Sequence, residues 1–423
     1  MACTRQRSRA AAASGSGNGD EMINVTFITT VDRNPGDAFI RAGIEYLLQQ
    51  FVPLYRASYF DKHDIRTLDK NWKYLSAHPQ PVQRLLRLCF RLAGKTEEMF
   101  DTADLIVQAG TPFYYILPGR DGTYRTFSSS VSTDWIQDAW LKRVLTRNYR
   151  ATVMNLAVGT CQPFFSDSSE FDHSPELLDF VSRTVRRTAM TTVRDPVAIR
   201  LMERLRLPAH CLPCSAIFAP DFHQVFPEQP AFVAMNYMRG GAHYDLGQKL
   251  DSDGWERTFL ALYRELARRY RVILMCNSAS EVTHVRALLP QAETFFSPRY
   301  EDYLKMYARA RFGVFNRVHA GVALAGLGRP SVVVGNDSRA RMAEMMGLPT
   351  YFVNDAGYDR IMAHVTSFES EPDRWSADLG QRKNDARLGY LHALSAGLEP
   401  VIAGLKDSAG YHRSGYDKVW VNR

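Results

Sequence analysis

Short apolar runs alternate with amphipathic runs along most of the chain. The first apolar run, at residues 23–30, is β-branched. It is followed by the turn cluster Asn34-Pro-Gly-Asp37 and then by apolar residues at helical spacing from Ile40 to Phe51. A strand, a glycine-containing loop and a helix start are typical of the opening of an α/β unit. Asp37 stands where a helix N-cap is expected. Further strands are expected at 104–109, 151–158 and 188–193, each ending in a loop with Gly, polar or charged residues.

A second alternating series follows the segment 208–230, which has five prolines and little periodicity. We therefore expect a domain boundary there. The pattern predicts an α/β protein of two Rossmann-like domains facing a cleft, divided as 23–215 and 216–423. Residues 1–22, rich in Ala, Ser and Gly, are expected to be a disordered leader. The second domain is expected to contain six strands and five helices, and then a helix near 382–396 that crosses back to the first domain, followed by a tail. These expected strands lie at 231–237, 271–276, near 294, 312–315, 331–334 and 350–353, and the helices at 255–270, 279–289, 300–308, 318–327 and 338–346.

Composition narrows the class of protein. The chain has 423 residues, 45% of them hydrophobic, and a net charge of +7 at pH 7. No apolar run approaches the roughly 20 residues that span a bilayer, so we expect a cytoplasmic protein. The basic excess favours an acidic partner: nucleic acid, anionic lipid or a small anion. No zinc-finger spacing, aromatic RNA-binding motif or helix-turn-helix pattern is present, which argues against nucleic acid.

The positive charge is concentrated in two segments. Residues 56–95 hold nine Lys and Arg against three Asp and Glu, and residues 183–206 hold seven against two. Cations at helical spacing in the first segment form one stripe (Arg84, Arg87, Arg91 and Lys95). Such a stripe is either the solvated face of a packed helix, which is the simpler interpretation, or a peripheral contact with an anionic membrane. The second segment contains Arg194 and fits a cleft for a small anion.

The densest candidate site is Phe315-Asn-Arg-Val-His-Ala320, where an expected strand leads into a helix start. Residues i and i+2 of an extended stretch share one face, so Arg317 and His319 are expected to converge on one anion. A guanidinium suits a carboxylate or phosphate, and an imidazole exchanges protons near neutral pH. An arginine that caps a loop beside a half-exposed histidine is the alternative.

Three motifs in this region resemble those of the polysaccharide pyruvyl transferases. They are Arg317-Val-His319-Ala320, Leu327-Gly-Arg-Pro330 before a strand, and Gly347-Leu-Pro349 after the next helix. Weaker similarities occur upstream, in the family's order, at Asn34 to Asp37, Asp104 to Thr111, Arg194-Asp195 and Ala234 to Asn236. Two departures stand out. Ala-Gly-Thr occupies a loop that is usually a glycine run in the family, and Pro196 follows Arg194-Asp195.

This resemblance implies a GT-B-like fold and transfer of a pyruvyl group from phosphoenolpyruvate to two sugar hydroxyls, forming a ketal. It implies His319 as general acid/base, Arg317 and Arg194 as clamps for the anionic donor, and Arg339 as a third cation. Further residues are expected in the substrate site: Asn34, Asp37, Gly110, Thr111 and Asn236. For Asp37, a plain N-cap is an equally good interpretation. We expect no metal and no cofactor besides the donor substrate. The acceptor is a saccharide, and whether it is free or lipid-linked stays open.

Two alternatives belong to other functional classes. A GT-B nucleotide-sugar glycosyltransferase shares the expected architecture, and Glu281 or Glu344 would then contact the ribose. A non-catalytic protein could retain the site for anion recognition alone. Fold analogy does not decide between them.

Overall fold

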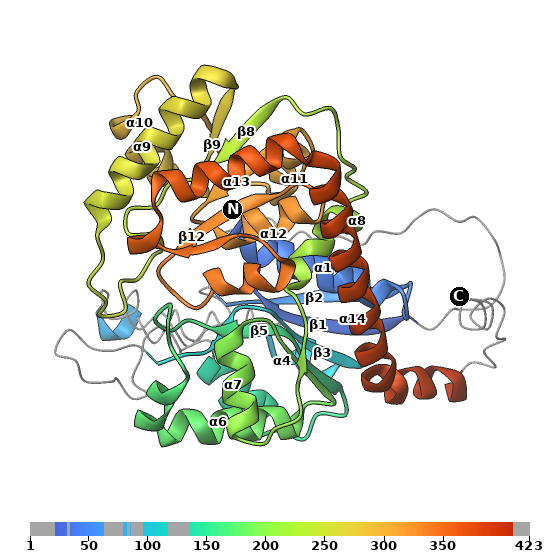
Figure 1. The fold of residues 1–423 in the computed structure, drawn as a ribbon. Helices are drawn as coiled ribbons and strands as arrows, with labels where there is room; N and C mark the ends of the chain where they lie inside the picture. Colours follow the sequence, from blue (N-terminus) through green and yellow to red (C-terminus); the bar gives the residue numbers. More distant parts are fainter. Residues whose placement is uncertain are drawn as a thin grey trace.

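The computed structural model describes residues 22–31, 34–62, 79–82, 85, 96–116 and 136–408. In this part of the chain, two parallel β-sheets come from the two halves of the sequence, with helices on their faces and between them (Figure 1). This confirms the predicted class of two Rossmann-like α/β units with a GT-B-like arrangement. The leader 1–21 and the tail 409–423 lie outside the described residues, and the boundary at 215/216 stays a prediction.

The first sheet is parallel throughout, in the order β2-β1-β3-β5-β6-β7, with β4 paired to β5. The chain reverses its direction of growth between β1 and β3, so a crevice is expected beside their carboxyl ends. The strands are β1 (Ile23–Thr29), β2 (Tyr55–Asp61), β3 (Leu105–Ala109), β4 (Pro112–Tyr114), β5 (Thr152–Thr160), β6 (Met190–Val193) and β7 (His210–Cys211).

The second sheet has the order β10-β9-β8-β11-β12-β13, also parallel throughout. This is the Rossmann order, and its reversal point lies between β8 and β11. The strands are β8 (Phe232–Met235), β9 (Val272–Met275), β10 (Glu293–Phe295), β11 (Ala310–Phe315), β12 (Ser331–Gly335) and β13 (Thr350–Phe352).

The helices connect these strands, and four of the five helices predicted for the second half between 255 and 346 are present. Pro at the first turn and a side-chain cap begin several of them, as at α6 and α7. They are α1 (Pro35–Gln49), α4 (Thr96–Asp101), α6 (Pro175–Arg187), α7 (Pro196–Arg204), α8 (Ala219–Phe222), α9 (Ser252–Arg269), α10 (Ala279–Leu288), α11 (Tyr300–Ala308), α12 (Val318–Ala325), α13 (Tyr358–Ser370) and α14 (Pro372–Ser408). Short turns of other helix types are η3 (Gln137–Val144), η4 (Ser169–His173), η5 (Ser215–Phe218), η6 (Ala340–Met346) and η7 (Val353–Asp355).

A shared core joins the two halves. Side chains of α1, η5, α8, α11 and α12 form one buried cluster between the sheets. Gly43 lets α1 approach η5, since an added Cβ would lie 1.7 Å from the carbonyl oxygen of Ser215. Helix α14 runs from the second half across to β5 and β6, where Tyr390 Oη donates to the carbonyl of Pro213 at 2.9 Å (Figure 1). The two sheets are therefore held with their carboxyl edges toward a common space.

The structure departs from the predicted elements at several places. Residues 55–61 form β2, at the edge of the first sheet, where the sequence analysis predicted no strand. It also predicted neither β4 nor α6. The expected helix 338–346 is the 3-10 turn η6, and α13 was not predicted. Arg84, Arg87, Arg91 and Lys95 lie outside the described residues. Within the described chain, no helix is long and apolar enough to cross a membrane.

Candidate active site

The candidate residues gather at the reversal points of the two sheets. Asn34 and Asp37 follow β1, Thr111 follows β3, Asn236 follows β8, and Arg317 follows β11. The carboxyl ends of strands at a reversal point are where open α/β sheets bind ligands. The topology therefore brings together residues that are up to 285 positions apart in the chain (34 to 319).

Arg194 and His319 lie in direct contact across the two halves. Arg194 immediately follows β6 and is fully buried, and its Nη1 lies 3.2 Å from His319 Nε2. The same nitrogen donates to Cys214 Sγ at 3.4 Å. Its Nε and Nη2 are buried without a hydrogen-bond partner among the described residues. Unsatisfied buried donors are rare in proteins, and their presence points to a ligand that would accept from them.

His319 is a neutral imidazole in this arrangement. Burial and the positive charge of Arg194 lower its pKa to about 3, although Asp37 opposes the shift. Because a guanidinium can only donate, Nε2 accepts from Arg194 and the proton resides on Nδ1. The ring packs on Gly36, where an added Cβ would lie 2.7 Å from Nδ1. A glycine at this position of the Asn-Pro-Gly-Asp turn is therefore required by the imidazole.

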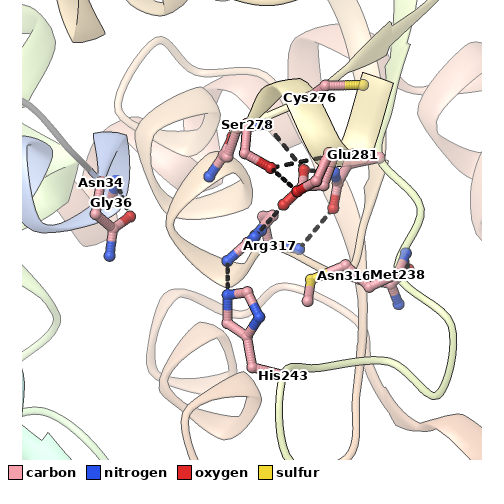
Figure 2. A network of polar contacts seen from close by, with 12 residues as sticks. Asn34, Gly36, Met238, His243, Cys276, Ser278, Glu281, Asn316 and Arg317 are labelled. Carbon is pink, nitrogen blue, oxygen red and sulfur yellow. Dashed lines mark hydrogen bonds and ion pairs between the residues drawn. The ribbon is translucent and has the colours of Figure 1, made fainter. Parts of the chain in front are cut away.

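The predicted convergence of Arg317 and His319 is wrong in its geometry. Arg317 is the N-cap of α12, and His319 lies in the first turn of that helix rather than in an extended stretch. The guanidinium of Arg317 forms an ion pair with Glu281 and contacts His243, with 2.6 Å between Arg317 Nη1 and His243 Nε2 (Figure 2). The strand does lead into a helix start, as expected, but the two side chains engage different partners.

Asn236 fixes the backbone beneath this ion pair. Its Oδ1 accepts from the backbone N–H of Arg317 at 3.1 Å, and its Nδ2 donates to the carbonyl of Met275 at 2.8 Å. Glu281, in the first turn of α10, also accepts from the backbone of Asn277 at 2.8 Å. Glu281 is thus held in place by Arg317 and is not a solvated helix residue, whereas Glu344 pairs with Arg341 at the surface.

Asp37 is not the N-cap of α1, which is Asn34, whose Oδ1 accepts from Gly36 N at 3.0 Å. Asp37 is buried and accepts from Thr30 Oγ1 at 2.6 Å. Its Oδ2 also lies 3.3 Å from Lys62 Nζ. Burial alone would raise the pKa of this carboxyl, but Lys62 and Thr30 outweigh it and hold the pKa well below its usual range.

Lys62 is a site residue that the sequence analysis missed. It is 3% exposed and donates to Thr111 Oγ1 at 2.7 Å as well as contacting Asp37. Burial lowers the pKa of its ammonium group, while Asp37 opposes the change. Lys62 lies in a segment rich in charged residues, which is typical of a surface, so the sequence did not indicate that it is buried. Only the pairing of β2 with β1 brings it to the carboxyl edge of the sheet.

The loop after β3 has two residues with positive φ, one of which is not a glycine. Gly110 and Thr111 have φ of 65° and 86°, in the left-handed region that favours glycine. A non-glycine residue there costs free energy of order 1–3 kcal/mol, and such residues concentrate at functional sites. Thr111 replaces a glycine of the family's usual run, and its hydroxyl holds Lys62.

Arg339 lies on the opposite wall, bound by both carboxylate oxygens of Asp337 at 3.0 and 2.5 Å. Asp337 offsets burial and raises the pKa of Arg339 further. The adjoining Ser338 joins the halves, since its Oγ lies 2.8 Å from Thr160 Oγ1 and accepts from Gln162 N at 3.0 Å. The cations Lys62, Arg317 and Arg339 each have a carboxylate partner, whereas no ion pair is recorded for Arg194 in the described chain. No group of His, Cys, Asp and Glu able to hold a metal ion occurs among the described residues.

Comparison with known proteins identifies the family. The model of the family described as polysaccharide pyruvyl transferase matches residues 34–338, which contain the loop after β1, Arg194, Arg317 and His319. The chain belongs to the polysaccharide pyruvyl transferase family. This confirms the resemblance drawn from the ordered motifs. No curated protein matches the chain.

Solved structures share the architecture at low identity. A proposed UDP-N-acetylglucosamine 2-epimerase from Listeria monocytogenes is 12% identical, with a TM-score of 0.52 over 93% of this chain and 99% of that one. S. aureus MnaA, solved with UDP, is 10% identical with a TM-score of 0.48, covering 92% and 97%. The wall teichoic acid polymerase TagF is 10% identical with a TM-score of 0.46, covering 91% and 90%. The Listeria likeness supports the GT-B-type fold.

Proposed function

We propose that this transferase moves the pyruvyl group of phosphoenolpyruvate onto two hydroxyls of a saccharide, forming a cyclic ketal and releasing phosphate. The observation that carries the proposal is the buried Arg194, whose Nη1 contacts His319 while its Nε and Nη2 have no partner among the described residues. Guanidinium forks bind carboxylates and phosphates strongly, and the donor carries both groups. Family membership supports the same reaction.

The reaction balances with groups of this chain as proton carriers. A proton adds to the methylene carbon of the enol, and positive charge develops at the neighbouring carbon that bears the phosphate. The first acceptor hydroxyl bonds to that carbon and gives up its proton. The carbon–phosphate oxygen bond then breaks, the second hydroxyl bonds to the same carbon, and its proton leaves with phosphate. We assign His319 to donate the proton to the methylene carbon and then to take the proton that the first acceptor hydroxyl gives up.

Arg194 and Arg317 are assigned to the anionic groups of the donor, with Arg339 beside them. Both terminal nitrogens of Arg317 already contact Glu281 or His243, and only its Nε lacks a partner among the described residues, whereas Arg194 has two unpartnered nitrogens, Nε and Nη2. We therefore propose that Arg194 makes the stronger contact with phosphoenolpyruvate. Lys62, Asp37 and Thr111 shape the side of the site after β1 and β3. No metal or organic cofactor enters this scheme.

Donor binding is expected to protonate His319. The imidazole has a pKa of about 3 beside Arg194, so it lacks the proton that it must donate at neutral pH. A bound phosphate and carboxylate would offset the nearby positive charge and raise this pKa. Calorimetric titration with phosphoenolpyruvate in buffers of different ionisation enthalpy should show proton uptake. The titration is best done at mildly alkaline pH, where the donor phosphate is already ionised. His319→Asn should abolish the uptake, and uptake that persists in this variant would assign the proton to another group.

The function itself is tested by phosphate release. Phosphoenolpyruvate is incubated with galactosyl, mannosyl and glucosaminyl acceptors, and acceptor-dependent phosphate is measured. His319→Ala should lower the rate by a factor of about 10²–10⁴, the usual contribution of a general acid/base. Full-rate release by this variant would remove His319 from the mechanism.

Transfer of a sugar from a nucleotide donor is the alternative function, and the same protein preparation can test it. The structure of MnaA contains UDP, and that protein shares the overall layout at low identity. If UDP or GDP raises the melting temperature and phosphoenolpyruvate does not, the proposed donor is wrong. The carboxylate of Glu281 already binds Arg317, which argues against its use as a ribose contact.

A further inference from the structure

We propose that the loop between β8 and α9, together with Phe165, forms the binding site for the saccharide acceptor. We call residues 237–251 the rim loop. The inference rests on the proposed function, because it names where the second substrate of that reaction binds. It assigns a role to exposed aromatic rings that the donor site does not use.

The rim loop spans the two halves beside the donor residues. On one side His243 contacts Arg317, as Figure 2 shows. On the other side Leu246, 6% exposed, packs into the core cluster of the first half. Between them the carbonyl of Tyr244 accepts from Asn336 Nδ2 at 2.8 Å. A substrate that reaches the donor at Arg317 therefore has the rim loop as a wall.

Two exposed aromatic rings stand at this wall. Tyr244 is 47% exposed, and Phe165 is 67% exposed. The segments that carry them meet at Asn336, since the backbone N–H of Phe164 donates to its carbonyl at 3.2 Å. Gln248 bridges the same two segments, accepting from Phe164 N at 3.3 Å and donating to the Asn336 carbonyl at 2.7 Å.

Phe165 lies at the carboxyl edges of both sheets. It follows the end of β5, and its ring packs against Phe352, the last residue of β13, with 5.1 Å between centroids. Both edges border the space in which Arg194 and His319 meet. A single exposed ring is common on protein surfaces, but Phe165 is grouped with the rings of Phe164 and Phe352 at the edge of the site, where apolar groups are available to contact a ligand.

Asn336 adds an unsatisfied acceptor between the rings. Its side chain is 1% exposed, and its Oδ1 has no hydrogen-bond partner among the described residues. An amide oxygen can only accept, so it selects a ligand with hydroxyl or amide donors and disfavours an anion. The oxygen is shielded in this arrangement, so binding requires a shift of the rim loop.

These features together match a pyranose. One face of the sugar presents C–H groups that pack on an aromatic ring, and its edge presents hydroxyls for Asn336, Gln248 and His243. The same sugar would place two of its hydroxyls toward a donor held at Arg194. A nucleotide or phosphate would instead seek cations, and the groups that Asn336 itself contacts, on Tyr244, Gln248 and Phe164, are neutral.

Saturation-transfer NMR on the full chain tests this assignment directly. The probes are methyl β-galactoside, methyl α-mannoside and N-acetylglucosamine, each with phosphoenolpyruvate present. Tyr244→Ala and Phe165→Ala are compared with Phe226→Ala. Phe226 is 72% exposed but lies near the amino edge of the second sheet, where the neighbouring Glu228 N donates to the Ala308 carbonyl. Tyr244→Phe keeps the ring as a conservative control.

The assignment predicts signals from sugar C–H protons in the wild type and in the Phe226 and Tyr244→Phe variants. In Tyr244→Ala and Phe165→Ala we expect these signals to be lost and the KM for the acceptor sugar to rise about tenfold, with the Kd for phosphoenolpyruvate unchanged. Equal signals in all variants, or no signal from any of the three sugars, would overturn the assignment. If Tyr244→Ala and Phe165→Ala release phosphate from phosphoenolpyruvate with an unchanged KM for the acceptor sugar, the assignment is wrong but the proposed function stands. If the wild type does not bind phosphoenolpyruvate, the proposed function itself is contradicted.

Discussion

Replacing Arg194 with methionine is expected to slow transfer strongly while leaving the folded protein as stable as before, or more stable. The guanidinium is fully buried, two of its nitrogens have no partner among the described residues, and no carboxylate pairs with it there. Such a cation costs desolvation that an apolar chain of similar length avoids. Removing a preorganised donor from the reacting anion should lower kcat by about 10²–10³.

Melting temperature and steady-state rate of the same preparation check this result. His319 should also titrate at higher pH in the Arg194→Met variant, because the positive charge of Arg194 contributes to its low pKa; proton NMR of the imidazole reports it. Arg183→Met is the matched control, since Arg183 is exposed and paired only with Asp179 at the surface. A variant that retains activity and loses stability would show Arg194 to be a structural residue.

Breaking the Lys62–Asp37 pair is expected to have the largest effect on stability. Lys62→Met leaves the carboxylate of Asp37 buried without its cation, and removal of one partner of a buried pair typically costs about 3–5 kcal/mol. Asp37→Asn likewise leaves the ammonium group of Lys62 buried without its carboxylate partner. The double variant removes both charges, so its free energy of unfolding should recover part of the summed loss.

Urea denaturation of the two single variants and the double variant measures this coupling. Arg56→Met is the control from the same strand, since Arg56 is exposed and should change stability by less than about 0.5 kcal/mol. Because the pKa of Asp37 is held low, the stability from this pair is present above the usual aspartate range and is lost as pH falls through the lowered value. Strictly additive losses would show that the two groups do not interact.

The architecture could be predicted because local patterns determine it. The β-branched runs of β1, β5 and β12 and the amphipathic helices between strands are visible in the sequence, and their alternation implies parallel sheets. The strand β2 was missed because it is an edge strand with mostly half-buried positions and a basic composition. Its place depends on the register with β1, which no local pattern carries.

The members of the site could be predicted better than their partners. Arg194, Asp37, Arg317 and His319 were all expected from ordered motifs. The structure places Asp37, Arg317 and His319 at the sheet reversal points and Arg194 at the carboxyl end of β6. Two of their pairings depend on residues far away in the sequence: Lys62 for Asp37 and Glu281 for Arg317. Asp337, the partner of Arg339, is only two residues away in the chain. The local rule for an extended stretch failed at His319, since α12 begins at Val318 and His319 already lies in its first turn.

The fold shows that only some of the cations in the two basic segments belong to the site. The basic segment 183–206 contains Arg194 in the site, but Arg200 and Arg204 bind the carbonyls of Ser166 and Ser168 and so support a loop. Lys62, from the other basic segment, is buried in the site rather than available for docking. Positive charge in the sequence thus located the site only in part.

Carbon-13 NMR of the transfer reaction tests the central proposal most directly. Phosphoenolpyruvate labelled at the carbon that bears the phosphate is incubated with the enzyme and the three sugars. We predict that the label moves from an enol carbon to a ketal carbon bonded to two sugar oxygens, with one phosphate released for each ketal formed. An unchanged enol signal in an enzyme that transfers sugar from a nucleotide donor would contradict the proposal.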